Sequence, residues 1–289
     1  MATLVCLGLG YTAAHYVGSF GKRFDRVIGT TRKLRAATDR VELFAFDGTK
    51  VSSELVACVE ESDALLISAP PGEGGDPVLA CLADAIARGR TRNVVYLSTI
   101  GVYGDSGGAW VDEETPPNPG SKRSLARLAA EEAWRRLGAE NGKAVAILRL
   151  AGIYGPARNA LVTVAEGTAR RIIKPGQVFN RIHVTDIARA IDACFARGAA
   201  GIFNLADDEP APPQDVIAFA AEFMGKPAPP EIPFDEARAT MSAMAQSFYA
   251  ENRRVRNDKL KQTLGVRLAC PTYREGLRAL LDKRIVSGE

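Results

Sequence analysis

A short apolar segment that runs directly into a glycine-rich turn constrains the fold of this chain more than any other feature. Residues 3–7 read Thr-Leu-Val-Cys-Leu, and a Gly-x-Gly-x-x-Ala pattern follows. The segment predicts a buried strand, and residues 11–20 after the turn are predicted to form a helix. Such a turn lets a diphosphate approach the backbone and rest on the helix N-terminus, where unpaired N–H groups favour anions. The residues predicted to bind a dinucleotide in this way are Gly8, Gly10, Tyr11, Thr12 and Ala13.

Short apolar runs alternate with helical patterns through the first two-thirds of the chain. Strands are predicted at residues 3–7, 25–30, 42–46, 63–69, 93–98, 144–150 and 201–205, and helices at 11–20, 77–89, 122–138 and 184–196. Strands that are apolar throughout and separated by helices indicate a parallel sheet covered on both faces. The predicted fold class is therefore α/β, with a doubly wound NAD(P)-binding Rossmann domain whose ligands bind beyond the carboxyl ends of the strands.

The last third of the chain differs in character, because proline-rich segments at 210–213 and 226–233 interrupt its helical pieces. We interpret it as a smaller, mostly helical substrate lobe. The predicted Rossmann domain comprises residues 1–155 and about 180–208, and the lobe comprises 156–179 and 209–289.

Composition excludes several classes of function. A net charge of +3 with scattered basic residues gives no reason to expect a nucleic-acid partner, and no segment is apolar for long enough to span a membrane. Five cysteines without paired or metal-ligand spacing, together with only two histidines, argue against a metal site. These features predict a cytoplasmic protein with reduced thiols.

The second predicted strand ends in Thr30-Thr31-Arg32-Lys33, where an NAD-specific fold usually has an acidic residue for the ribose 2′-OH. Thr31 and Arg32 are instead suited to the 2′-phosphate of NADP, since charge-assisted bonds from a guanidinium favour a phosphate. NADP is therefore the predicted cofactor, with NAD as the alternative. Exposed basic residues in an ordinary turn are the other interpretation of this segment.

Residues after the next two strands are also predicted to border the cofactor. Asp47 follows the third strand and is placed near the adenine, although an Asp-Gly pair is equally typical of a simple turn. Ala69 and Pro70 follow the fourth strand and suit a close-packed wall beside the cofactor.

Three further segments occur in a fixed order. They are Tyr-Leu-Ser-Thr-Ile-Gly-Val-Tyr-Gly at 96–104, Leu-Arg-Leu-Ala-Gly-Ile-Tyr-Gly-Pro at 148–156 and Phe-Asn-Arg-Ile-His-Val-Thr-Asp-Ile-Ala at 179–188. With the N-terminal turn, they make residues 1 to about 208 resemble the short-chain dehydrogenase/reductase superfamily, in its extended branch of NAD-dependent epimerase/dehydratases. Extended members usually have Gly-x-x-Gly-x-x-Gly, which would need glycine at Leu7, so the chain resembles an atypical subgroup.

The resemblance implies catalytic positions, and this chain departs from two of them. Thr99 matches the family's catalytic Ser/Thr, but the Tyr-x-x-x-Lys pair falls on Arg123 and Arg127 when residues 128–131 are aligned. A shift of one residue would place Ser124 there instead, which is no better a match. A guanidinium cannot shuttle a proton at neutral pH, but it can stabilise an oxyanion or bind an anionic substrate. Ordinary surface cations at i, i+4 spacing are the alternative.

Other residues in the resembling segments are candidates for the site. Tyr103 is a candidate hydroxyl donor, while Tyr154 and His183 are placed beside the cofactor. Packing is the alternative for the two tyrosines, and a hydrogen-bonded link between the lobes is the alternative for His183. The stretch 104–119, rich in Gly, Asp, Glu and Pro, is predicted to act as a flap over the site.

Two functions follow as hypotheses. The first is an NADP-binding oxidoreductase or epimerase/dehydratase-like enzyme that acts on a small polar substrate and lacks the Tyr-Lys pair. The second is a non-catalytic NADP(H)-binding sensor or regulatory protein, which would explain the missing pair directly. The resemblance also implies a homodimer.

Overall fold

A parallel sheet of seven strands forms the centre of the cofactor half of the molecule in the computed structural model, which describes residues 2–33 and 40–287, with side chains to residue 281. The strands are β1 (Thr3–Leu7), β2 (Arg26–Thr31), β3 (Glu42–Ala45), β4 (Ala64–Ile67), β5 (Asn93–Thr99), β7 (Ala144–Leu150) and β11 (Gly201–Leu205). Their order is β11-β7-β5-β4-β1-β2-β3, and every neighbouring pair is parallel. The order reverses between β1 and β4, which is where doubly wound sheets bind ligands. All seven predicted strands are thereby confirmed, as is the Rossmann fold.

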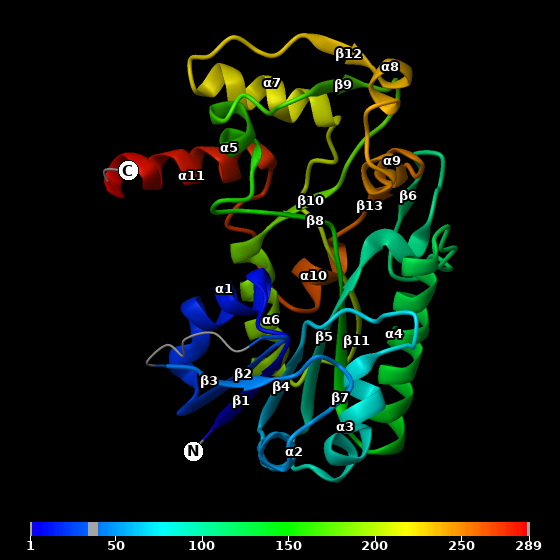
Figure 1. Ribbon diagram of the computed structural model, residues 1–289, viewed down its shortest axis with the longest axis vertical. Coiled ribbons are helices and arrows are strands. Elements are labelled where there is room, and N and C mark those ends of the chain that lie inside the picture. Colours follow the sequence, from blue (N-terminus) through cyan, green and yellow to red (C-terminus); the bar gives the residue numbers. More distant parts are fainter. Residues whose placement is uncertain (1, 34–39, 288–289) are drawn as a thin grey trace.

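Helices cover both faces of this sheet, as Figure 1 shows. They are α1 (Tyr11–Phe20), α2 (Ser53–Glu60), α3 (Pro77–Arg88), α4 (Lys122–Glu140) and α6 (Val184–Arg197), with a short 3₁₀ turn, η1 (Gly21–Arg23), after α1. Alternate residues of a strand point to opposite faces. Leu4 and Cys6 accordingly pack in the core under α1 and α6, whereas Val5 and Leu7 pack in the core under α2, α3 and α4. Strands with apolar side chains on both faces are needed to fill both cores.

Local capping explains where most of these helices begin. Asp76 accepts hydrogen bonds from the backbone N–H groups of Val78 and Leu79, and Pro77 occupies the first turn of α3. Ser121 caps α4, and the αL conformation of Gly198 ends α6. Helix α2 was not predicted from the sequence, because its eight residues are too few for a clear helical period, although Ser52 caps it.

The remaining elements form a second lobe at the carboxyl ends of the strands, in the upper half of Figure 1. They are α5 (Ala160–Ala165), β9 (Arg171–Ile173), α7 (Pro213–Phe223), β12 (Glu231–Pro233), α8 (Phe234–Arg238), α9 (Ala243–Tyr249) and α11 (Tyr273–Ser287). Helices α5, α7 and α11 share one small core, and β9 pairs with β12 beside it. The prediction of a smaller lobe made mostly of helices is therefore confirmed, with short strand pairs added.

Two short strand pairs join the halves. One is β8 (Gly152–Tyr154) with β10 (Arg181–His183), and the other is β6 (Trp110–Val111) with β13 (Arg254–Val255). The turn η2 (Ile100–Tyr103) precedes β6, and α10 (Asp258–Gln262) follows β13.

The loop predicted to be a flap, residues 104–119, is tied down by the second of these pairs. Its backbone N–H groups at Ser106 and Gly108 both donate to the carbonyl of Asn252. Further along, Glu113 Oε1 accepts the backbone N–H of Asn204 at 2.7 Å, on the edge strand β11. The loop therefore connects the two halves, and these contacts do not support the idea of a free flap.

No helix within residues 2–33 and 40–287 is long and apolar enough to cross a membrane. In the same ranges, no three His, Cys, Asp or Glu side chains are grouped so that they could hold a metal ion.

Candidate active site

The turn after β1 requires glycine at its first position. Gly8 has φ +97°, and a Cβ at this position would lie 2.6 Å from the backbone nitrogen of Ala69, at the end of β4. The Gly8 N–H donates to Thr30 Oγ1 at 2.8 Å, and Ala69 N–H donates to the Leu7 carbonyl at 2.9 Å. These contacts fix the ends of β1, β2 and β4 against one another at the place where the strand order reverses.

Helix α1 begins beside this edge of the sheet, with open space in front of its N-terminus. Gly10 is the exposed N-cap residue, it makes no side-chain cap, and a Cβ added to it would meet no atom within 4 Å. Tyr11 is partly exposed, while Thr12 and Ala13 are buried against the sheet. An uncapped helix N-terminus with open space in front of it fits the diphosphate of a dinucleotide. The five residues predicted for this role thus lie together.

The end of β2 presents an exposed cation. Thr31 Oγ1 donates to the carbonyl of Lys33 at 2.8 Å, which shapes the turn, and Arg32 is exposed on it. Asp47 is exposed too, but its Oδ1 accepts hydrogen bonds from the N–H and hydroxyl of Thr49. Those bonds lower the pKa of Asp47 and give its carboxylate a role in its own turn. Ala69 is partly buried and Pro70 exposed at the neighbouring end of β4.

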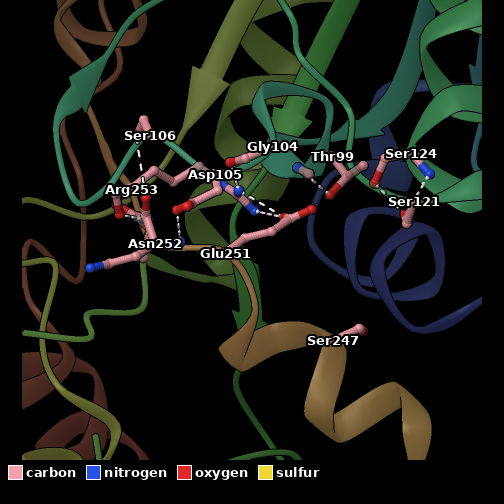
Figure 2. Close-up of polar contacts among 12 residues, drawn as sticks. Thr99, Gly104, Asp105, Ser106, Ser121, Ser124, Ser247, Glu251, Asn252 and Arg253 are labelled. Carbon is pink, nitrogen blue, oxygen red and sulfur yellow. Dashed lines mark hydrogen bonds and ion pairs between the residues drawn. The ribbon is translucent and has the colours of Figure 1, made fainter. Parts of the chain in front are cut away.

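Thr99 is the last residue of β5, beside the N-terminus of α4, and Figure 2 shows it facing Ser124 and Ser121. Its Oγ1 accepts the backbone N–H of Gly101 at 3.1 Å. Ser124 is buried, and its Oγ accepts a hydrogen bond from Ser121 Oγ at 2.9 Å. The structure therefore gathers three hydroxyls at this end of the sheet, of which only Thr99 was predicted as a site residue.

The two arginines at the Tyr and Lys positions have different surroundings. Arg123 is exposed, and its guanidinium lies 5.7 Å from the ring centre of Phe248 on α9. Arg127 is half-buried, and its Nη1 donates to the Tyr96 hydroxyl at 3.0 Å and to the Leu97 carbonyl at 2.9 Å. Arg127 thus anchors α4 to β5, and Arg123 connects α4 to the second lobe.

Tyr103 lies inside the protein. Its hydroxyl donates to Asn204 Oδ1 at 2.8 Å, and the Arg149 guanidinium lies 4.8 Å from its ring centre. Burial raises the pKa of Tyr103. These contacts favour the packing role that was the alternative to hydroxyl donation.

Behind Tyr103, Arg149 and Glu131 form an ion pair at 2.8 Å with both side chains 2% exposed. The sequence reasoning had placed Arg149 in an apolar strand and Glu131 at the end of the aligned motif without pairing them. A charged residue inside a buried strand was the signal, because a buried charge needs a partner.

Tyr154 and His183 meet edge to face, with ring centres 5.0 Å apart, on the paired strands β8 and β10. His183 Nδ1 accepts the N–H of Thr185 at 3.2 Å and so caps α6, while the Tyr154 hydroxyl donates to the Thr272 carbonyl at 3.4 Å. Both side chains are buried where the two halves join.

Tyr154 also lines a pocket of about 380 Å³ between β8 and helices α5, α7 and α11. Three arginines line it, Arg158, Arg170 and Arg181, and no acidic side chain does so among the residues that the structure describes. Arg181 Nη1 donates to the carbonyls of Phe179 and Ala211, which holds this cation in place. Arg158 lies 5.9 Å from the ring centre of Tyr11, so the pocket adjoins the start of α1. None of these arginines was predicted as a site residue, although Arg181 belongs to the segment 179–188.

Asp207 is buried near Arg181, behind the pocket. Its backbone N–H donates to the Arg181 carbonyl at 2.7 Å, and its Oδ1 accepts the N–H of Glu209 at 3.3 Å. Burial raises the pKa of Asp207 to about 8, against the opposing effect of the Arg181 charge. This carboxyl group therefore titrates near neutral pH.

Comparison with known proteins agrees with this geometry. A family model described as the NAD dependent epimerase/dehydratase family matches residues 78–206. The protein YeeZ of Escherichia coli K12 is 30% identical over 226 residues, which are 71% of this chain and 77% of that protein. A 3-diazoavenalumate denitrifying reductase from a Streptomyces species is 27% identical over 215 residues, 68% of each chain.

A solved structure covers nearly the whole chain. It is a functionally unknown conserved protein from Silicibacter pomeroyi, 46% identical, with a TM-score of 0.85 over 98% of this chain and 99% of that one. The strand order, the glycine turn and these matches agree, and the chain belongs to the NAD-dependent epimerase/dehydratase family, in the extended branch of the short-chain dehydrogenase/reductases.

Proposed function

We propose that this protein is an NADP(H)-dependent oxidoreductase that reduces a carbonyl group of a small anionic compound held between its two halves. The observation that carries this proposal is the arginine-lined pocket beside the open N-terminus of α1. Arg158 lines the pocket and lies over the ring of Tyr11, the first residue of α1. Residues 1–155 with about 180–208 would bind the cofactor, and residues 156–179 with 209–289 would bind the substrate. The implied homodimer stays a prediction.

The preference for NADP rests on the end of β2. Arg32 is exposed there, and the adjoining residues 30–33 include no carboxylate that would favour the ribose 2′-OH of NAD. The open space at Gly10 and the first turn of α1 would receive the diphosphate. When bound, the reduced cofactor supplies a hydride.

The anionic character of the substrate rests on charge. Arg158, Arg170 and Arg181 face a pocket without an opposing carboxylate among its described lining residues, and guanidinium groups bind carboxylates and phosphates well. Apolar side chains of α7 and α11 line another part of the pocket, which therefore suits a compound with one charged and one apolar end.

Reduction is favoured over epimerisation or dehydration because it makes the smallest demand on proton transfer. Carbonyl reduction needs a hydroxyl near the reacting oxygen and one proton, which Thr99 and solvent can provide. Arg123 and Arg127 cannot act as a general acid or base at neutral pH. The similar Streptomyces protein is named as a reductase, which supports the same choice.

Calorimetry with NADPH and NADH, followed by NADPH-oxidation assays, tests the proposal. The carbonyl panel should contain 2-oxoacids and phosphorylated aldehydes, each paired with its neutral ester or dephosphorylated form. We expect NADPH to bind more tightly than NADH and the charged member of a pair to be reduced faster. Arg158→Met should raise KM for the charged member alone. Equal rates within every pair, or tight NADPH binding with no turnover, would contradict the proposal.

One observation favours a second function, a non-catalytic NADP(H)-binding sensor. Both positions of the missing pair hold cations that already contact protein groups, Arg123 on Phe248 and Arg127 on Tyr96 and Leu97. A sensor would bind NADPH tightly without turnover, and its affinity for a partner protein would change with the redox state of the cofactor. A pull-down insensitive to NADP and NADPH would remove this alternative.

A further inference from the structure

The hydroxyls of Thr99 and Ser124 converge on the same place in the site. A Cβ built at Gly101 would lie 3.2 Å from Ser124 Oγ and 3.4 Å from Thr99 Oγ1. Gly101 does not have a positive φ, so backbone conformation does not require glycine there. Because residue 101 is glycine, no side chain at this position comes between the two hydroxyls, which lie close together in Figure 2.

Each of the two hydroxyl oxygens already accepts a hydrogen bond from the protein. Thr99 Oγ1 accepts the N–H of Gly101, and Ser124 Oγ accepts the hydroxyl of Ser121. A serine or threonine hydroxyl has a single proton to donate. Within the described part of the chain, no hydrogen bond uses the proton of either Thr99 or Ser124, so both remain available to an oxygen of a ligand.

We propose that Thr99 and Ser124 form a two-donor oxyanion site, in which Ser124 takes the part of the missing tyrosine. This inference rests on the proposed carbonyl reduction and adds a catalytic residue to it. Ser124 is one position beyond Arg123, so the hydroxyl comes from the next residue of α4. Its burial strengthens the effect, because hydrogen bonds to developing charge are worth more away from water.

The proton needed for the reduction reaches the substrate oxygen along a chain of hydroxyls, from Ser121 through Ser124. NADPH would supply the hydride, losing a C–H bond and becoming NADP+, and a C–H bond would form at the carbonyl carbon. The π electron pair would move to the carbonyl oxygen, which Thr99 and Ser124 would hydrogen-bond. Ser124 passes its proton to that oxygen, Ser121 passes its own proton to Ser124, and solvent returns a proton to Ser121. Ser121 is half-buried at the start of α4, so solvent reaches this end of the chain of hydroxyls.

A carboxylate of the second lobe borders the same entrance. A Cβ at Gly120, next to Ser121, would lie 3.2 Å from Glu251 Oε1. Arg253 pairs with Glu251 at 2.7 Å and also donates to the Gly104 carbonyl, so the carboxylate is fixed relative to the loop over the site. The solvent that serves Ser121 therefore lies beside a fixed negative charge.

Turnover of the best carbonyl substrate gives the first test. Ser124→Ala should lower kcat about 10- to 100-fold, the value of one hydrogen bond to a developing charge. Gly101→Ala, which puts a methyl group between the hydroxyls, should lower kcat similarly while NADPH affinity and melting temperature change little. The matched control is Ser62→Ala, since Ser62 is also a buried serine with one hydrogen bond, to the Val59 carbonyl.

Binding of acetate, the simplest stable oxyanion, gives a test that needs no turnover. Carbon-13 NMR of labelled acetate should show binding to the NADP-loaded protein, weakened about 10-fold by Ser124→Ala and unchanged by Ser62→Ala. If acetate binding depends on Ser124 while no carbonyl is reduced, the oxyanion site stands and the proposed function falls. If carbonyls are reduced and Ser124→Ala changes neither kcat nor acetate binding, the oxyanion site is wrong and the reductase remains. Failure of acetate to bind the unaltered protein also overturns the oxyanion site.

Discussion

At the carboxyl edge of the sheet, the part proposed to bind the cofactor (the cofactor side) and the part proposed to carry the reaction (the reaction side) differ in how they are built. On the cofactor side, backbone conformation and missing side chains determine the shape, through Gly8, Gly10 and the uncapped start of α1. On the reaction side, individual side chains determine it, through Thr99, Ser124 and the arginines of α4. Backbone geometry changes little when single side chains are replaced. A family can therefore keep its cofactor frame while its reaction chemistry diverges.

The largest change in the free energy of unfolding is expected at the buried Glu131–Arg149 ion pair, which supports the reaction side. Glu131→Ala leaves Arg149 buried without its partner, which should lower the free energy of unfolding by about 3–5 kcal/mol. Urea unfolding measures this loss. Glu60→Ala is the control, because the Glu60–Arg88 pair is exposed and its removal should cost less than about 1 kcal/mol. Equal losses would mean that the buried pair does not hold α4 against the sheet.

The next comparison separates the two glycines of the cofactor side. Gly8→Ala should lower the free energy of unfolding by about 2–4 kcal/mol, because its φ is +97° and the methyl group meets Ala69. Gly10→Ala should leave stability unchanged but weaken NADPH binding, since its methyl group enters the space proposed for the diphosphate. Thermal unfolding and calorimetry measure the two effects. Normal NADPH affinity in Gly10→Ala would place the diphosphate elsewhere.

A third experiment tests whether the Arg32 side chain determines the preference for NADPH over NADH. Arg32→Ala should weaken NADPH binding about 10- to 100-fold and leave NADH binding unchanged, because only NADPH carries the 2′-phosphate. Arg136→Ala removes an equally exposed cation on α4 and serves as the control. An equal loss of affinity for NADPH and NADH would mean that Arg32 does not bind the 2′-phosphate.

The last comparison concerns pH and the joint between the two halves. The pKa of Asp207 is raised to about 8 in the folded protein, so the folded state binds more protons than the unfolded state between the ordinary Asp pKa and pH 8. Stability therefore falls as pH rises through this window. Asp207→Asn should remove that fall, by at most about 1.4 kcal/mol per pH unit, and the gap between the proteins should stop growing above pH 8. Urea unfolding from pH 4 to 9 checks this, and parallel curves would assign the pH dependence to other groups.

The sequence predicted the sheet well because its strands are buried on both faces. Apolar runs such as residues 64–67 can be recognised without tertiary information, and all seven strands were found. The glycine turn was predictable for a similar reason, since a strand, a turn and a helix follow one another along the chain. Helix α2 was missed because a helix of eight residues gives a weak periodic signal.

The reaction side was harder to predict, since its contacts join residues that are far apart in sequence. The packing of Tyr103 on Arg149 and the convergence of Thr99 and Ser124 depend on where α4 and β7 lie against β5. The arginine pocket brings together segments around residues 158, 170 and 181, which no local pattern connects. Periodicity reports which face of an element is buried, but not which neighbour lies on it.

Glu113 affects how the edge strand of the central sheet can pair with another chain. An open sheet ends in strands whose outward N–H and C=O groups can pair with a second chain, and β11 is such an edge. The half-buried carboxyl group of Glu113 accepts the N–H of Asn204, so this N–H is not open to a second chain. A strand of another molecule would find this N–H already bonded, so the loop that joins the two halves also blocks edge-to-edge pairing at this position of β11.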